Sequence, residues 1–167
     1  KNQELIFTRS SKGHLNINRW NEELMPKTLK GNNKLAVTQK MVDAYAMNDG
    51  RSITEAAATG DYVTEGFTTQ AYAAVNPFLP ANVSLMYNNR EPRFYASIIY
   101  NGADWIYEED GKPKQTVELY FNGNCGKNGS HDHSATGYLT CKNISPNSDL
   151  INWTGVTRSN VMIRLAE

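Results

Sequence analysis

One short cluster has the residue types that bind metal ions. His131-Asp132-His133 places three candidate ligands in a loop of small residues, and Cys125 lies upstream in the same loop. Zinc ligands must converge on one point, whereas successive side chains of an extended segment point apart. The sequence has no fourth ligand at a recognisable zinc spacing. The pattern favours a solvated loop, with a metal site as the alternative.

A second cluster, residues 108–110, contains adjacent carboxylates of the kind used in acid–base catalysis. A glycosidase needs two such groups facing each other across a cleft. Three neighbouring acids in front of Gly-Lys-Pro are more typical of an exposed turn. The sequence contains no nucleophile elbow, phosphate-binding loop or dinucleotide fingerprint. It therefore predicts no catalytic residue, no metal and no cofactor.

The third chemical pattern combines aromatic rings with short polar side chains. The C–H face of a sugar lies against a flat ring, while asparagine and arginine bond the hydroxyl groups. One stretch with both features surrounds a tryptophan, and another runs from Tyr62 to Tyr72. Each ring can instead hold its own loop on the core. The candidate glycan-binding residues are Asn18, Arg19, Trp20, Tyr62, Phe67 and Tyr72.

The composition restricts the partners of the chain. The 167 residues include 17 basic residues (lysine plus arginine) and 17 acidic residues (aspartate plus glutamate). No net charge therefore directs the chain to nucleic acid or to an anionic membrane. No apolar run approaches the length that spans a bilayer. The length suits one domain with its own core.

Two cysteines, Cys125 and Cys141, flank the loop of small residues. A disulfide between them would stabilise the fold by roughly 3 kcal/mol in an oxidising compartment. In a reducing compartment they would remain thiols. The spacing alone leaves both states open.

Short helices are expected to position these residues. Thr38 can cap a helix through Met47, with Met41, Val42 and Tyr45 on one face. A turn over residues 48–50 should end it.

The segment that contains the candidate tyrosines is expected to form two further short helices. Ser52 or Thr54 can cap the first, which stops near Gly60. The second is expected over residues 68–75, before an Asn-Pro pair.

The strands are expected to be short as well. Residues 4–9, 116–121 and 137–142 combine apolar and alternating patterns. Pro92 suits the first turn of a helix, after which the alternation from Phe94 to Tyr100 predicts a strand that ends at Asn101-Gly102. We therefore expect a loop-rich α+β chain with short helices and a few short strands.

Four segments together resemble the SusD/RagB family. Residues 89–102 (NREPRFYASIIYNG) with Trp105 are similar to its Asp/Glu-Pro-Arg-Phe-Tyr signature, and residues 38–50 (TQKMVDAYAMNDG) to its Thr-Gln-x-x-Val-Asp-x-Tyr segment. Residues 136–139 (TGYL) resemble its Thr-Gly-Tyr strand, and residues 163–167 (IRLAE) the start of its Arg-Leu-Ala-Glu helix. The segments occur in the family's order, and this order is more specific than any single motif.

The resemblance implies a non-catalytic surface lipoprotein of the outer membrane. Such proteins bind oligosaccharide or another nutrient and pass it to a TonB-dependent transporter of the SusC type. The parent fold is mostly helical, with tetratricopeptide-like helix pairs and a loop-rich region that contains these motifs. The resemblance also implies that residues 1–167 are a single SusD/RagB-type region that is incomplete at both ends, with the lipid anchor outside it.

Ligand choice is expected to depend on the segments outside the shared motifs. A motif common to proteins with many ligands should be scaffold, so Trp105 is expected to pack in the core. The loop around Trp20 and then the segment from Tyr62 to Tyr72 are the expected glycan contacts. The alternative function is that of a secreted glycan hydrolase or metal-dependent enzyme, which would use the acidic turn or the His-Asp-His loop.

Overall fold

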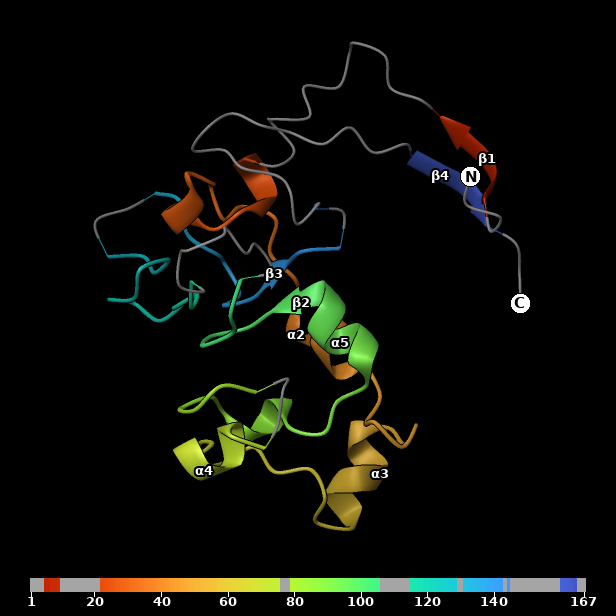
Figure 1. The fold of residues 1–167 in the computed structure, drawn as a ribbon, viewed down its shortest axis with the longest axis vertical. Helices are drawn as coiled ribbons and strands as arrows, with labels where there is room; N and C mark the ends of the chain where they lie inside the picture. Colours follow the sequence, from red (N-terminus) through yellow and green to blue (C-terminus); the bar gives the residue numbers. More distant parts are fainter. Residues whose placement is uncertain are drawn as a thin grey trace.

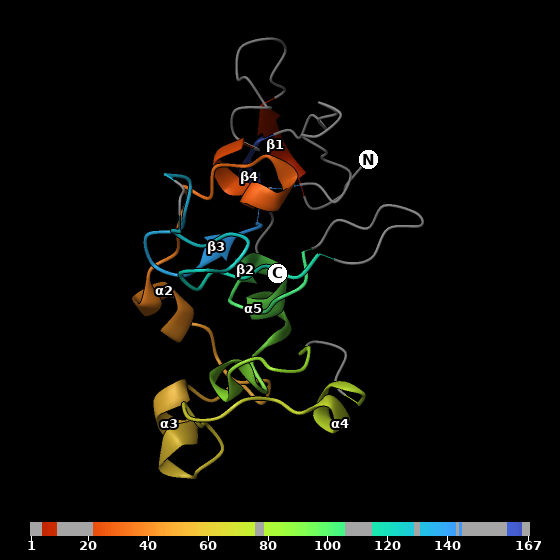
Figure 2. The ribbon, with the colours of Figure 1, turned by 90° about the vertical axis from the view of Figure 1, so that its left-hand side faces the viewer.

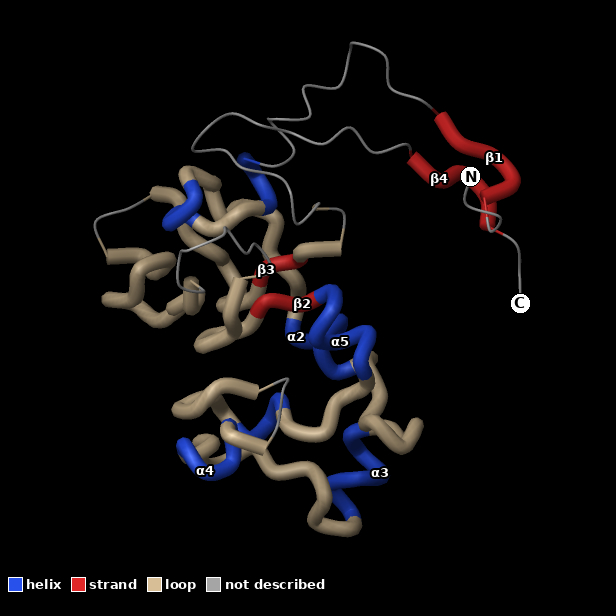
Figure 3. Tube along the Cα trace, viewed as in Figure 1, coloured by secondary structure: helices blue, strands red, loops and turns tan. Residues whose placement is uncertain are grey.

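The computed structural model describes residues 5–9, 22–75, 79–105, 115–128, 131–142, 144 and 160–164. Loops connect short elements throughout this part of the chain (Figure 3). The helices are η1 (Lys27–Leu29), α2 (Gln39–Asp43), α3 (Ile53–Ala58), α4 (Gln70–Ala73), η2 (Leu85–Tyr87) and α5 (Pro92–Ser97), where η marks a 3-10 turn. The strands are β1 (Leu5–Arg9), β2 (Ile98–Ile99), β3 (Leu139–Thr140) and β4 (Asn160–Arg164). This architecture confirms the expected loop-rich α+β class.

Two antiparallel strand pairs join segments that are far apart in the sequence (Figure 1). β1 pairs with β4, which confirms the strand expected near residues 4–9. Residues 163–164 therefore belong to a strand, and the prediction that a helix starts there is wrong for these two residues. β2 pairs with β3, and Ala36 forms a further bridge to Leu139 on the other side of β3.

The central motif folds as a helix where a strand was expected. Pro92 occupies the first turn of α5 and the helix continues through Ser97, so the predicted strand from Phe94 is wrong except at Ile98–Ile99. Helical spacing brings Phe94 and Ile98 onto the same buried side. Asn101-Gly102 forms the expected turn, with a positive φ of 88° at Gly102.

α2 is shorter than the sequence predicted. Thr38 caps it as expected by accepting a hydrogen bond from the Met41 amide, but the helix ends at Asp43. Beyond that point the Ala46 amide donates to the Glu91 carboxylate and the Met47 amide to the Arg51 carbonyl. Partners outside the helix thus take the amides that a longer helix would need, and Met41 is exposed.

α3 and α4 lie closer to the predicted ranges, because caps near their first residues define where they begin. Ser52 accepts a hydrogen bond from the Glu55 amide while the Glu55 carboxylate accepts from the Ser52 amide, which forms a capping box at the start of α3. Thr69 caps α4 through the Tyr72 amide, so this helix lies inside the predicted range of 68–75.

An aromatic cluster forms the centre of the core. The Phe94 ring stacks on Tyr100 at 5.6 Å and on Tyr87 at 6.0 Å between centroids, and it meets Tyr45 edge-on at 5.8 Å. Trp105 is buried, as expected for a scaffold residue. The shared motif therefore supplies much of the packing that holds the chain together.

Residues 116–121 do not form the expected strand. Val117 is buried and Leu119 is partly buried, but Phe121 is exposed, so the three alternate residues do not share one buried face. Thr116 forms an isolated bridge with Asp104, and the chain then turns.

Cys125 and Cys141 are both buried free thiols, so the structure shows no bridge between them. Burial raises the pKa of the Cys141 thiol to about 11, which keeps it protonated at neutral pH. None of the helices in the described part of the chain has the length and apolar character needed to cross a membrane.

Candidate functional site

The six candidate glycan-binding residues fall into two groups. Asn18, Arg19 and Trp20 lie outside the described residues, as does the acidic turn at 108–110. Tyr62, Phe67 and Tyr72 lie in the part of the fold that contains α3, α4 and η2 (Figures 1 and 2). The structure gives these three rings different surroundings.

Phe67 is the most exposed ring of the three. Its side chain is 68% exposed, although its backbone forms a bridge with Ser84. The adjacent residue, Thr68, is buried, and its hydroxyl donates to the Pro80 carbonyl at 2.6 Å. The strand-like pairing therefore fixes the backbone of Phe67, while the ring remains exposed to solvent. This geometry suits a ring that receives a ligand from solvent.

Tyr72 performs a mainly structural task. The ring lies on α4 and packs against the core, and its hydroxyl forms a hydrogen bond with the Asn88 side-chain oxygen. This bond ties α4 to the residues that follow η2. Tyr72 thereby holds α4 against the fold that supports Phe67.

Tyr62 is half-buried and faces a polar cluster. Its amide donates to the Ala56 carbonyl at the end of α3. Burial raises the pKa of the Tyr62 phenol, the positive charge of Arg90 lowers it, and the negative charge of Asp43 raises it. The phenol therefore lies within electrostatic range of both groups.

Arg90 is the unexpected member of this cluster. It is only 2% exposed, and Nη2 donates to the carbonyls of Val42 and Tyr45 at 2.6 and 2.8 Å. The guanidinium carbon lies 4.8 Å from the centroid of the Phe94 ring. Its Nε and Nη1 atoms have no hydrogen-bond partner among the described residues.

Burial lowers the pKa of the Arg90 guanidinium, and the nearby Tyr62 and Asp43 oppose this shift. Asp43 in turn accepts a hydrogen bond from Gln39 at 2.7 Å, and Gln39 accepts one from the Tyr138 hydroxyl at 2.8 Å. Hydrogen bonds thus join α2 to the Thr-Gly-Tyr segment, and Tyr62 lies within electrostatic range of Asp43 and Arg90. We call Gln39, Asp43, Tyr62, Arg90 and Tyr138 the Arg90 cluster. Four of these residues belong to the shared motifs, and their electrostatic link to Tyr62 was not predicted because it joins segments distant in the sequence.

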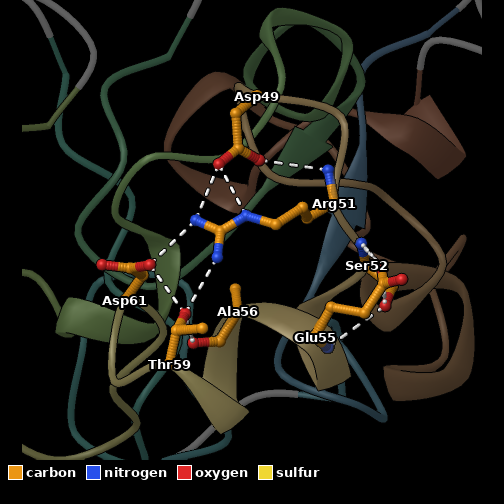
Figure 4. A network of polar contacts seen from close by, with 7 residues as sticks. All are labelled: Asp49, Arg51, Ser52, Glu55, Ala56, Thr59 and Asp61. Atoms are coloured by element: carbon orange, nitrogen blue, oxygen red, sulfur yellow. Dashed lines mark hydrogen bonds and ion pairs between the residues drawn. The ribbon is translucent and has the colours of Figure 1, made fainter.

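A second polar network fixes the chain just before Tyr62 (Figure 4). The Arg51 guanidinium donates to Asp49, Thr59 and Asp61, each at 2.8 Å. The Thr59 hydroxyl also donates to Asp61 at 2.7 Å. Bonds to Arg51 lower the pKa of Asp49, and bonds from Thr59 and then Arg51 lower the pKa of Asp61. The network holds residues 59–61 against the end of α3 and so helps to position Tyr62.

This network predicts a local effect of acid. Since the pKa of both aspartates lies below the ordinary value of 3.8, their contribution is complete above that value and disappears as the pH falls through the folded-state pKa. We expect the amide of Tyr62 to lose protection from hydrogen exchange as the pH falls through the lowered pKa values of the two aspartates, after correction for intrinsic exchange rates. An Arg51→Met variant should show low protection already at pH 7. Equal protection of this amide at pH 7 and at a pH where both aspartates are protonated would contradict the prediction in the unaltered protein.

The His-Asp-His loop shows no metal site in the part of the chain that the structure describes. Within that part, no group of three or more histidine, cysteine, aspartate or glutamate side chains is arranged to hold an ion. The Asp132 carbonyl instead accepts a hydrogen bond from the Asn33 side chain at 3.2 Å.

Comparison with known proteins gives a consistent family relationship. The model of the SusD family matches residues 3–167. A SusD-like protein from Bacteroides fragilis is 25% identical, with a TM-score of 0.64 over 98% of this chain and 30% of that chain. The structure named BT4246 is 18% identical, with a TM-score of 0.66 over 98% of this chain and 28% of that chain. This chain thus spans about a third of the length of these structures. Comparison with curated proteins gives no match.

Proposed function

The chain belongs to the SusD family, and from this premise we propose that it takes part in the non-catalytic binding of oligosaccharide or polysaccharide at the cell surface. The bound glycan is delivered to a SusC-like TonB-dependent transporter. A lipid anchor outside this chain holds the protein on the extracellular face of the outer membrane. The family match over residues 3–167 is the observation that carries this proposal, because it includes both the motifs and the segments between them.

The proposed glycan contacts come from the two segments outside the motifs. Trp20, with Asn18 and Arg19, supplies a ring and hydroxyl-binding groups from one segment. Phe67 supplies a ring from the other, and its exposure supports this role. Tyr62 presents a half-buried phenol within electrostatic range of Arg90 and Asp43, and Tyr72 ties α4 to Asn88.

We expect a Phe67→Ala substitution to weaken glycan binding about tenfold, which corresponds to about 1.4 kcal/mol. The ring contributes little to folding because it is exposed, so the fold should be retained. Binding is measured by screening the intact protein on a glycan array and titrating the best-bound oligosaccharide by calorimetry. Trp20→Ala should give a loss of similar size. Val75→Ala is the matched control, because Val75 is an exposed apolar residue without a ring.

Two outcomes would contradict this proposal. Unchanged affinity in both ring variants would remove the proposed contacts. Release of new reducing ends from a polysaccharide by the unaltered protein, measured with and without a chelator, would support the alternative of a glycan hydrolase or metal-dependent enzyme.

A further inference from the structure

Two adjacent rings stand in water on a loop that the proposed function does not use. Tyr120 is 52% exposed and Phe121 is 63% exposed. The alternation over residues 116–121 predicted a strand, whereas in the structure the chain turns here and both rings are exposed. Single exposed rings are common on protein surfaces and do not by themselves indicate a site. Two rings on a loop with a fixed backbone can form one, so the hydrogen bonds of this loop matter.

Backbone hydrogen bonds fold residues 118–128 into a closed loop. The Gly123 amide donates to the Tyr120 carbonyl, the Cys125 amide to the Glu118 carbonyl and the Asn128 amide to the Phe121 carbonyl, all at 2.9 Å. The turn is tight, since a Cβ atom on Gly126 would lie 1.9 Å from the Tyr120 carbonyl oxygen. The buried Cys125 side chain anchors the loop to the core. The backbone beneath both rings is therefore fixed.

Side chains add to this rigidity and provide polar groups. Asn124 accepts a hydrogen bond from the Glu118 amide at 3.0 Å and donates to the Thr116 carbonyl at 2.9 Å. The negative charge of Glu118 raises the pKa of the Tyr120 phenol, so the carboxylate and this hydroxyl lie within electrostatic range of each other. Asn128 donates to the Asn122 side-chain oxygen at 3.0 Å. Among the described residues no hydrogen bond involves the Asn122 amide nitrogen or the Asn128 side-chain oxygen, so these two atoms can bond hydroxyl groups of a ligand.

The chemistry of the exposed side chains favours a sugar over a protein partner. The exposed members are rings, amides and one lysine, and the two aliphatic or sulfur side chains of the loop, Leu119 and Cys125, turn inward. A protein-binding patch would be expected to add exposed aliphatic side chains around the rings. Rings beside amides instead match the C–H faces and hydroxyl groups of pyranose sugars.

We propose that the loop over residues 118–128 is a second carbohydrate-binding site, which receives an uncharged stretch of the same polymeric glycan through Phe121, Tyr120 and the Asn122–Asn128 pair. This inference rests on the proposed function. The loop and α4, which follows Phe67, lie toward the same side of the molecule (Figures 1 and 2). A long glycan can therefore engage both places, whereas a short one occupies only the first.

The test uses the intact protein and an oligosaccharide series of increasing length, chosen from the best-bound glycan on the array. We expect Phe121→Ala to weaken binding of the longest member about tenfold and to leave the shortest binding member unchanged. Phe67→Ala should weaken binding of both. Phe121→Tyr should retain binding because it keeps a flat ring, whereas Phe121→Leu should behave like Phe121→Ala. Met41→Ala provides a control at another exposed apolar residue.

The outcomes separate the two proposals. If the unaltered protein binds no glycan on the array, the proposed function fails and the second site fails with it. If the unaltered protein binds and Phe67→Ala weakens binding while Phe121→Ala has no effect at any length, only the second site is overturned. Full binding by Phe121→Leu would also overturn it, because general apolar contact with a protein surface would then explain the exposed residue better than ring stacking.

Discussion

Replacement of Phe94 with alanine is expected to lower the free energy of unfolding by about 3–5 kcal/mol. The Phe94 side chain is fully buried, and its ring packs against Tyr87, Tyr100 and Tyr45. Removal of the ring leaves a cavity in a cluster whose other members are fixed by their own contacts. Chemical denaturation of the intact protein, followed by tyrosine fluorescence or circular dichroism, measures the change.

The control for this prediction is the same substitution at an exposed ring. Phe121→Ala should change the free energy of unfolding by less than about 0.5 kcal/mol, because that side chain is largely in water. Phe94→Leu should fall between the two, since leucine fills part of the space. A Phe94→Ala variant as stable as Phe121→Ala would show that the aromatic cluster is not the centre of the core.

Local signals in the sequence predicted the starts of the helices well. Thr38 and Ser52 accept hydrogen bonds from amides three residues later, so the information that starts α2 and α3 lies within one turn of the chain. The turn at Asn101-Gly102 is local for the same reason. These features depend on neighbours in the sequence and could be identified without the fold.

The central motif shows where such reasoning fails. Apolar residues at 94, 96, 98 and 100 fit a strand, but Phe94 and Ile98 also share one face of a helix. Pro92 resolves the ambiguity because it sets the backbone of the first helical turn. The strand begins only at Ile98, where pairing with Thr140 supplies partners from a distant segment.

The candidate site depends even more on distant contacts. The sequence selected Tyr62 as a ring in a polar segment, but its electrostatic partners come from α2 and from the motif after η2. The exposure of Phe121 was also not predictable, since the alternating pattern indicated a strand through this residue and the chain instead turns at residues 121–126. Both features depend on the path of the chain between elements, which short patterns do not specify.

Replacement of Arg90 with methionine is expected to lower the free energy of unfolding by about 2–4 kcal/mol. Methionine has a similar length, but it leaves the carbonyls of Val42 and Tyr45 without their buried donor. Methionine also removes the free-energy cost of burying a positive charge, which offsets part of this loss. The loss of one member of a buried polar pair usually outweighs that gain. The same denaturation experiment measures the result.

A second measurement separates the electrostatic role of Arg90 from its packing. Because the charge of Arg90 lowers the pKa of the Tyr62 phenol, Arg90→Met should raise that pKa further above its ordinary value. NMR titration of protein with labelled tyrosine ring carbons follows the phenol directly. Arg90→Lys keeps the charge but loses the planar fork, so it should destabilise the fold while leaving the Tyr62 pKa nearly unchanged. An identical Tyr62 titration in the methionine and lysine variants would show that the charge of Arg90 has no effect on this phenol. Arg90 would then support this part of the structure through packing and hydrogen bonds alone, and the shared motif would affect the candidate glycan contact only by holding it in place.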